Sequence, residues 1–328
     1  MSESRDVEQL KLLNQAISKV KNEISKAIIG QKDIINELLV TIFSRGHCLM
    51  IGVPGLAKTM IIRSLAEALD LKYSRIQFTP DLMPGDITGT EIIQENVSTG
   101  EKEFRFVRGP IFSNIILADE INRTPPKTQS ALLEAMQEHE VTTAGTTYTL
   151  EEPFFVLATQ NPIEQEGTYP LPEAQLDRFM FNIWLDYPSM QEEIEIVKST
   201  TADYVPKIDK VLNGKQLIEF QDLIRRVPVA DNVVNYTVKL VQATRPGESS
   251  AGFIKDFISY GAGPRASQYL ILGAKTMAAF NGKYTPDIDD IKQAALPVLR
   301  HRIVTNFNAE AENISPSEII SKLIEAVK

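Results

Sequence analysis

The fold is decided by one stretch of the chain, Gly52-Val53-Pro54-Gly55-Leu56-Ala57-Lys58-Thr59. Four apolar residues, 48–51, come directly before it and have the length of a buried strand, and a helical pattern of apolar residues begins at Thr59. The spacing of Gly52, Lys58 and Thr59 matches a phosphate-binding loop, in which backbone N–H groups at the start of a helix surround the phosphates. The stretch therefore predicts a strand–loop–helix unit of an α/β fold that binds a nucleotide.

Two side chains of this loop have predicted roles. Lys58 is placed to reach the β and γ phosphates, and the Thr59 hydroxyl to bind Mg²⁺. Position 57 holds alanine where the loop pattern has glycine, and a methyl group fits there only if φ is negative, so we expect a negative φ at Ala57. The predicted nucleotide contacts in this segment are Gly52, Val53, Pro54, Gly55, Leu56, Ala57, Lys58, Thr59 and Met60.

Further apolar runs of strand length follow along the chain, at 115–118, 154–158 and 179–185. A helical pattern at 130–138 lies between the first two, and an amphipathic helix over 7–28 precedes the loop. Strands that are apolar throughout are typical of a parallel sheet with helices on both faces. We therefore predict an α/β core with a parallel sheet.

Two segments break this alternation and are typical of β-hairpins. One runs from Thr90 to Val107 with turn residues at 96–100, and the other from Val141 to Leu150, turning near Ala144 and Gly145. We expect both to be insertions that project from the core, with tips that a partner can reach.

The pattern changes after Pro188. From Met190 onward the periodicity is helical, strand patterns nearly vanish and prolines recur. We therefore predict two domains: residues 1–188 form the nucleotide-binding α/β core with an N-terminal helix and two hairpin insertions, and residues 189–328 form a smaller, all-helical domain.

Acidic and amide side chains follow two of the predicted strands. Asp119 and Glu120 come directly after 115–118, and Asn161 follows 154–158. An acidic pair at the end of a buried strand suits a Walker B site, where Asp119 would hold Mg²⁺ through water and Glu120 would polarise the attacking water. The Asn161 amide could orient a water or contact the γ-phosphate, although Asn-Pro is also common in turns.

Two arginines complete the candidate site. Arg178 precedes the strand at 179–185, and Arg265 lies in a Gly/Pro-rich run that predicts the start of a helix in the second domain. An arginine can offset the charge of a phosphoryl group during transfer. Each could also belong to a structural ion pair.

Composition restricts the classes of protein that remain. The chain has 328 residues, 43% of them hydrophobic and 23% charged, which is ordinary globular composition, and its formal charge of −9 disfavours nucleic-acid binding. The single cysteine, Cys48, suits a reducing compartment, and His47, His139 and His301 lack the spacing of a zinc site. Because there is no long apolar run and no apolar leader at the N-terminus, we expect a cytoplasmic protein without a membrane span.

Taken together, these motifs resemble AAA+ ATPases, and several longer strings resemble the MoxR family of that class. The strings are 52–59, 119–129, 131–138 and 171–179, and the resemblance extends over nearly the whole chain, including 298–302. Ala57 is usual in that family. The resemblance implies an AAA+ core followed by a helical lid, and Mg²⁺-dependent ATP hydrolysis. It also implies hexameric rings and chaperone-like work with von Willebrand factor A domain proteins, in enzyme maturation, complex assembly or metal-cofactor insertion.

The resemblance further implies roles for single residues. Gly30 and Gln31 would border the adenine, Asn161 would be sensor 1, Arg178 the arginine finger and Arg265 sensor 2. A finger acts on the nucleotide of a neighbouring subunit, so the active unit would be an oligomer. A sensor on the lid implies that the nucleotide state moves the lid. The two hairpins would be the helix-2 and pre-sensor-1 insertions.

Two alternatives stay open on the sequence alone. The chain could be a nucleotide-gated scaffold with little turnover, although the intact Glu120 and Arg178 argue against it. It could also be a magnesium-chelatase-like or nucleic-acid motor, for which a basic lining at Lys102, Arg105 and Arg108 is the place to look. The remaining arginines that either contact a neighbouring subunit or are solvated are Arg123, Arg300 and Arg302.

Overall fold

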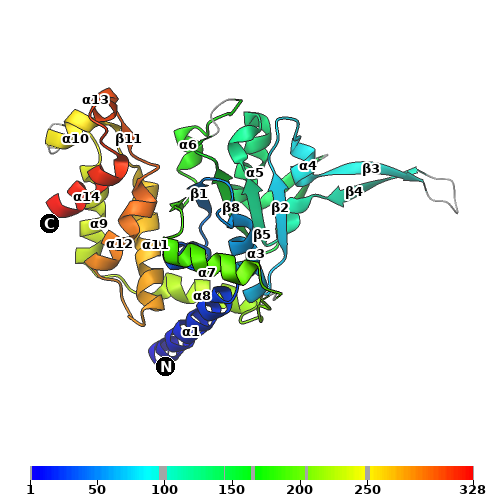
Figure 1. The fold of residues 1–328 in the computed structure, drawn as a ribbon, viewed down its shortest axis with the longest axis horizontal. Coiled ribbons are helices and arrows are strands. Elements are labelled where there is room, and N and C mark those ends of the chain that lie inside the picture. Colours follow the sequence, from blue (N-terminus) through cyan, green and yellow to red (C-terminus); the bar gives the residue numbers. More distant parts are fainter. Residues whose placement is uncertain are drawn as a thin grey trace.

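A five-stranded parallel sheet forms the centre of the protein in a computed structural model that describes residues 2–95, 102–143, 145–163, 167–203, 206–247 and 252–327 (Figure 1). Its strand order is β2-β5-β8-β1-β9. The strands are β1 (Cys48–Gly52), β2 (Tyr73–Gln77), β5 (Ile115–Asp119), β8 (Phe155–Gln160) and β9 (Phe181–Leu185). The predicted α/β fold with a parallel sheet is confirmed, and the four predicted strands all lie in this sheet.

The edge strand β2 is the one that the sequence does not predict. It reads Tyr-Ser-Arg-Ile-Gln, and only Ile76 is buried. An edge strand has a single neighbour, here β5, and needs no continuous apolar run. Arg75 and Gln77 are therefore polar residues of a sheet strand, at the edge next to Asp119.

The helices up to residue 200 precede, connect or follow the strands of this sheet. They are α1 (Ser2–Ser25), α2 (Lys32–Phe43), α3 (Lys58–Ala68), α4 (Pro84–Thr88), η1 (Pro110–Phe112), η2 (Ile121–Arg123), α5 (Pro126–Glu138), α6 (Glu173–Leu176) and α7 (Met190–Thr200). Helix α5 begins earlier than the predicted residue 130, because proline fits the first turn of a helix, where its missing N–H is not needed.

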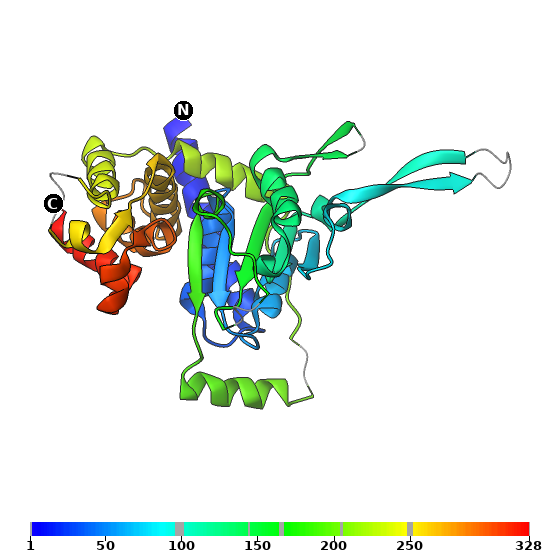
Figure 2. The same ribbon diagram turned by 90° about the horizontal axis from the view of Figure 1, so that it is seen from above.

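Alternate residues of the strands pack on opposite faces of the sheet. Cys48 and Met50 belong to the hydrophobic core that includes α1, α2 and α3, whereas Leu49 belongs to the core that includes α5. Both faces are thus covered, as the continuous apolar strands predict. Helix α7 differs from the others: it contains no buried residue, and it stands apart from the sheet in Figure 2.

The two predicted hairpins are confirmed. The first pairs β3 (Gly89–Glu95) with β4 (Lys102–Arg108), and the second pairs β6 (Glu140–Thr143) with β7 (Thr146–Thr149). Figure 1 shows β3 and β4 projecting far from the sheet, on the side away from the C-terminal helices. The predicted turn residues 96–100 and Ala144 lie outside the described residues. Stacking of Phe106 on Tyr148, with ring centroids 4.5 Å apart, links the two hairpins.

A helical lid follows, as predicted. Its helices are α8 (Gly214–Arg226), α9 (Asp231–Ala243), α10 (Gly252–Phe257), α11 (Pro264–Phe280), α12 (Ile288–Leu299), α13 (Phe307–Ala311) and α14 (Pro316–Ala326). The region is not strictly all-helical, because β10 (Ile258–Tyr260) and β11 (Val304–Thr305) form a small antiparallel ribbon. Among the helices described, none combines the length and the apolar character that crossing a membrane requires.

One buried arginine fastens the lid to the core. The Arg302 side chain is only 2% exposed, and its Nε donates to Asp177 Oδ1 at 2.7 Å. Its Nη2 donates to the carbonyls of Asp177 at 2.8 Å and Phe179 at 2.6 Å. Burial lowers the pKa of Arg302, while the charge of Asp177 opposes that shift. The expectation that Arg302 is solvated or reaches a neighbour is wrong, since its partners lie within its own chain.

We expect Arg302→Met to lower the free energy of unfolding by about 3–5 kcal/mol, because Asp177 then loses its buried partner. Urea denaturation followed by circular dichroism measures the change. Arg226→Met is the matched control: the Arg226 side chain is 52% exposed and pairs with Asp6, so the expected loss is below about 1 kcal/mol. Equal losses in the two variants would contradict a fastening role for Arg302.

Candidate nucleotide-binding site

The candidate site lies at the carboxyl ends of three adjacent strands. β1 leads into the phosphate-binding loop, β8 leads to Asn161, and β5 ends at Asp119 and is followed by Glu120. Because β5, β8 and β1 are neighbours in one parallel sheet, these ends meet at the same edge. The fold thus brings together the loop, the acidic pair and the asparagine, which are far apart in the sequence.

The loop joins a closely packed glycine, Gly52, to the first turn of helix α3. A Cβ at Gly52 would lie 2.8 Å from Leu185 Cβ and 3.0 Å from the Leu185 carbonyl oxygen, so only glycine fits there. Helix α3 begins at Lys58 with no side-chain hydrogen bond to its cap. The first N–H groups of a helix have no partner within the helix, so these groups are available to an anion.

Lys58 and Thr59 stand at this helix start. The Lys58 ammonium donates to the carbonyl of Gly52 across the loop. Burial lowers the pKa of Lys58, and the charges of Asp119 and Glu120 act in the opposite direction. The Thr59 side chain is exposed in the first turn of α3. A phosphate in the loop would therefore replace a carbonyl as the partner of Lys58.

Ala57 corrects one expectation. Its φ is 56° and its ψ is 22°, which places it in the left-handed region rather than at negative φ. The chain turns from the loop into α3 at this residue, and that turn overrides the preference of the side chain. A residue with a Cβ is less stable in this conformation by about 1–2 kcal/mol.

We therefore expect Ala57→Gly to raise the free energy of unfolding by about 0.5–1 kcal/mol, because glycine adopts positive φ without the Cβ conflict. Chemical denaturation of the nucleotide-free protein measures this gain. Ala66→Gly, within the same helix, should have the opposite sign and lose about 1 kcal/mol. Destabilisation by both substitutions would show that position 57 carries no strain.

Asp119 is held by two side chains from other strands. Its Oδ1 accepts from Thr159 Oγ1 at 2.6 Å, and its Oδ2 accepts from Arg75 Nη2 at 2.6 Å. Thr159 Oγ1 also accepts from the backbone N–H of Glu120 at 2.9 Å. The carboxylate is thus fixed at the end of β5. Neither Thr159 nor Arg75 is recognisable in the sequence, because both occupy ordinary strand positions.

Glu120 is oriented by two donors. Its Oε2 accepts from Gln77 Nε2 at 3.0 Å and from Arg123 Nη1 at 2.9 Å. Arg123 therefore contacts the candidate catalytic carboxylate of its own chain. The sequence predicts instead that Arg123 either contacts a neighbouring subunit or is solvated. These two donors hold the Glu120 carboxylate in one orientation.

Asn161 is buried, with 7% of its surface exposed, directly after β8. Its Oδ1 accepts from the backbone N–H of Ile163 at 3.2 Å, which is a turn contact. Because the side-chain oxygen of Asn161 makes this contact, its amide N–H groups are the ones that would donate to a γ-phosphate or a water.

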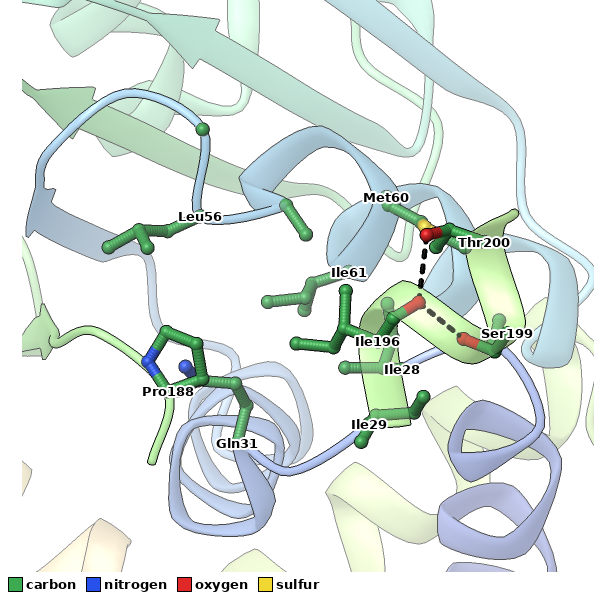
Figure 3. A pocket seen from close by; sticks show the side chains of 13 residues that line it. Ile28, Ile29, Gln31, Leu56, Met60, Ile61, Pro188, Ile196, Ser199 and Thr200 are labelled. Atoms are coloured by element: carbon green, nitrogen blue, oxygen red, sulfur yellow. Dashed lines mark hydrogen bonds between the residues drawn. The ribbon is translucent and has the colours of Figure 1, made fainter. Parts of the chain in front are cut away.

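An apolar cavity of about 130 Å³ lies beside the loop (Figure 3). Its lining is mostly apolar with few polar groups, which is typical of ligand pockets. In Figure 3, Ile196 of α7 lies opposite Ile61 of α3. The lining residues are Ala27, Ile28, Ile29, Gln31, Gly55, Leu56, Ala57, Met60, Ile61, Pro188, Ile196, Ser199 and Thr200.

Several of the predicted nucleotide contacts line this cavity and others do not. Gln31 lines it and donates through Nε2 to the carbonyl of Asp186 at 3.3 Å. Gly30 lies against α7, where a Cβ would collide with the Glu192 carboxylate. Val53 and Pro54 belong to the loop but do not line the cavity. The contribution of α7 is missed by sequence reasoning, because its apolar residues show only helical periodicity.

Arg178 and Arg265 lie at the other end of the sheet, where Arg178 Nη1 donates to the carbonyl of Leu133 at 2.7 Å. The N–H of Met180 donates to the carbonyl of His47 at 2.7 Å, so the Arg178 segment lies where the strands begin. Arg265 Nη1 donates to Asp177 Oδ2 at 3.1 Å. The five residues of β1 span about 16 Å. Asp177, the partner of Arg265, directly precedes Arg178 in the chain, and the structure brings neither arginine to Lys58 of the same chain.

The donors at the loop fit Mg²⁺ and a triphosphate. Thr59 offers a hydroxyl and Asp119 a carboxylate, and Mg²⁺ prefers such oxygen ligands while keeping several waters. Within the described ranges, no group of three or more His, Cys, Asp or Glu side chains is placed to hold a metal. The metal would thus be held chiefly by phosphate oxygens and water, with Thr59 and Asp119.

A phosphate-binding loop and an acidic pair at the carboxyl edge of a parallel sheet are found in P-loop ATPases, and the helical lid places this chain in the AAA+ class. Residues 47–181 match the model of the ATPase family associated with various cellular activities (AAA), and residues 252–323 match the AAA lid domain. The chain belongs to the MoxR family of AAA+ ATPases, whose members are chaperone-like. It is an ATP-hydrolysing P-loop enzyme.

Three relatives support this assignment. The chain is 42% identical to Chaperone MoxR1 of Mycobacterium tuberculosis over 306 residues, which covers 93% of this chain and 80% of that protein. It is 41% identical to YeaC of Bacillus subtilis over 317 residues, 96% and 95% of the two chains. A crystal structure from Cytophaga hutchinsonii, named as a candidate ATPase, superimposes with a TM-score of 0.93 at 44% identity and covers 100% and 99%.

The other singled-out side chains are engaged within the chain. Arg300 lies over the ring of Trp184 at 5.7 Å, and burial lowers its pKa. His47 is buried, and its Nδ1 accepts from the N–H of Val156 at 3.1 Å. His139 pairs with Glu152. On the first hairpin, Arg105 donates to Gln94 and Arg108 lies over Phe112.

Proposed function

We propose that the chain hydrolyses Mg²⁺-bound ATP in a closed ring of identical subunits, in which Arg178 and Arg265 of one copy complete the nucleotide site of the next. The separation of the two halves of the site supports this proposal. Lys58, Asp119 and Glu120 lie at the carboxyl ends of the strands, whereas Arg178 and Arg265 lie where the strands begin. Since one chain cannot bring them together, a second copy supplies the arginines.

Each residue has a chemical task in this proposal. Glu120 orients the attacking water, and Lys58 and the neighbour's Arg178 offset the charge on the γ-phosphoryl group. Asn161 contacts the γ-phosphate or this water. When bound, Mg²⁺ neutralises phosphate charge, and Thr59 and Asp119 would hold it. Arg265 acts beside Arg178 on the neighbour, so it does not sense the nucleotide of its own chain.

The ring would be closed by heterologous contacts, in which one edge of a subunit meets the opposite edge of the next. The family resemblance implies that the ring has six subunits. Because the lid is fastened to the Arg178 segment through Arg302 and Asp177, a change at one site moves both arginines that face the next. This coupling supports the proposal that ATP hydrolysis drives the remodelling of a partner protein.

We further propose that the output acts on a protein with a von Willebrand factor A domain, in enzyme maturation, complex assembly or metal-cofactor insertion. The two hairpins that project from the core support contact with a partner. The lone cysteine, Cys48, supports a cytoplasmic setting. Binding of a purified domain of this kind to the native chain, and to a variant with a short Gly-Ser turn in place of 90–107, tests the partner proposal; equal binding to both would exclude the hairpin.

Sedimentation velocity and steady-state ATPase assays test the ring. We expect ATP to shift the chain to a closed oligomer, specific activity to rise with protein concentration, and EDTA to abolish turnover. A chain that hydrolyses ATP equally well as a dilute monomer would contradict the proposal. A chain that binds ATP in a ring without turnover would be the nucleotide-gated scaffold instead.

A further inference from the structure

An arginine that has no role in the proposed chemistry engages the Walker B carboxylate. Arg75 approaches Asp119 Oδ2 with two donors, Nη2 at 2.6 Å and Nε at 3.2 Å. The other oxygen, Oδ1, accepts from Thr159 Oγ1 at 2.6 Å. Both oxygens of the proposed metal ligand are therefore engaged by side chains of the same chain.

The position of Arg75 allows it to leave. It lies on the edge strand β2, and its side chain is 47% exposed, compared with 15% for Asp119. Its Nη2 also donates to Gln77 Oε1 at 2.6 Å. Arg75 therefore keeps a hydrogen-bond partner on its own strand when another group binds Asp119. An ion pair this exposed contributes little and can be exchanged readily.

We propose that Arg75 competes with hydrated Mg²⁺ for Asp119, so that binding of a metal-bound nucleotide must displace the guanidinium and release of the metal-bound product is assisted by its return. Arg75 is then a positioning residue that sets how tightly the Mg²⁺-bound nucleotide is held. The inference rests on the proposed role of Asp119 toward Mg²⁺. It predicts that Arg75 affects nucleotide affinity only when the metal is present.

The experiment measures the affinity of a fluorescent ADP analogue with excess Mg²⁺ and with EDTA, and compares the ratio of the two dissociation constants. We expect this ratio, EDTA over Mg²⁺, to rise about two- to fivefold in Arg75→Gln, the range of an exposed ion pair. Arg75→Lys keeps the charge without the two-donor geometry and should fall between the native chain and Arg75→Gln.

Arg63→Gln is the matched control. Arg63 is an exposed arginine that pairs with Glu67. Burial raises the pKa of Tyr73, and the charges of both Arg75 and Arg63 oppose that shift, so Arg63 lies near the site. Its ratio should equal that of the native chain, because the lost charge shifts both of its affinities together. Since each ratio comes from one protein sample, a partly unfolded fraction does not change it.

An unchanged or lowered ratio in Arg75→Gln would overturn the inference; a lowered one would mean that Arg75 orients Asp119 for the metal. A native ratio of one would be a different failure, because it would remove the proposed Mg²⁺ role of Asp119 itself.

Discussion

Replacing Lys58 with alanine is expected to reduce ATP affinity by about 30-fold or more and to bring hydrolysis to background. Truncating a charged partner of a buried ionic contact costs about 2–5 kcal/mol, and each 1.4 kcal/mol is a factor of ten. Lys58 stands at the start of α3, half-buried, and donates across the loop to Gly52. Isothermal titration calorimetry with ATP and a coupled ATPase assay measure the two effects.

Lys72→Ala is the control for this prediction. The Lys72 side chain is 69% exposed and pairs with Glu151, so its removal should leave both affinity and turnover near the native values. Retention of substantial turnover in Lys58→Ala would contradict the assignment of the loop as the triphosphate site.

Replacing Glu120 with glutamine should lower turnover by about 10²- to 10⁴-fold, the contribution typical of a positioned acid–base group, while ATP affinity changes little. Glutamine preserves the shape of the side chain and can still accept from Gln77 and Arg123, but it cannot polarise water as a carboxylate does. Single-turnover hydrolysis and ATP binding, measured on the same preparation, separate the two quantities.

Glu151→Gln removes an exposed carboxylate, 63% accessible, and should keep native turnover. If Glu120→Gln lost ATP binding and turnover together, Glu120 would serve the architecture of the site rather than the attacking water.

The parts of this fold that sequence predicts are those where one local pattern decides the structure. The loop between 52 and 59 and the apolar strands are of this kind, since each is recognisable without knowledge of its neighbours. Strand β2 is not, because an edge strand can be polar, and its Arg75 and Gln77 become part of the site only through pairing with β5. Because the sequence does not predict β2, it does not predict that Arg75 and Gln77 donate to Asp119 and Glu120.

Tertiary context also explains the wrong expectations. Ala57 has positive φ because the turn into α3 requires it, and no local preference of alanine would predict that. Arg302 looks like a surface charge in the sequence, yet carbonyls from the Arg178 segment converge on it in the fold. The apolar cavity beside the loop is lined both by residues 27–31 and by α7, and these two segments are far apart in the sequence.

The measurement that tests the central claim most directly mixes two inactive variants. Arg178→Ala retains Glu120 but lacks the finger, which can be worth about 10³- to 10⁵-fold in rate, and Glu120→Gln retains the finger. If Arg178 acts on the neighbouring subunit, an equal mixture should recover about one quarter of native turnover, the fraction of sites with an intact Glu120 and an intact neighbouring finger in a randomly mixed ring. A mixture no more active than its two components would contradict the account.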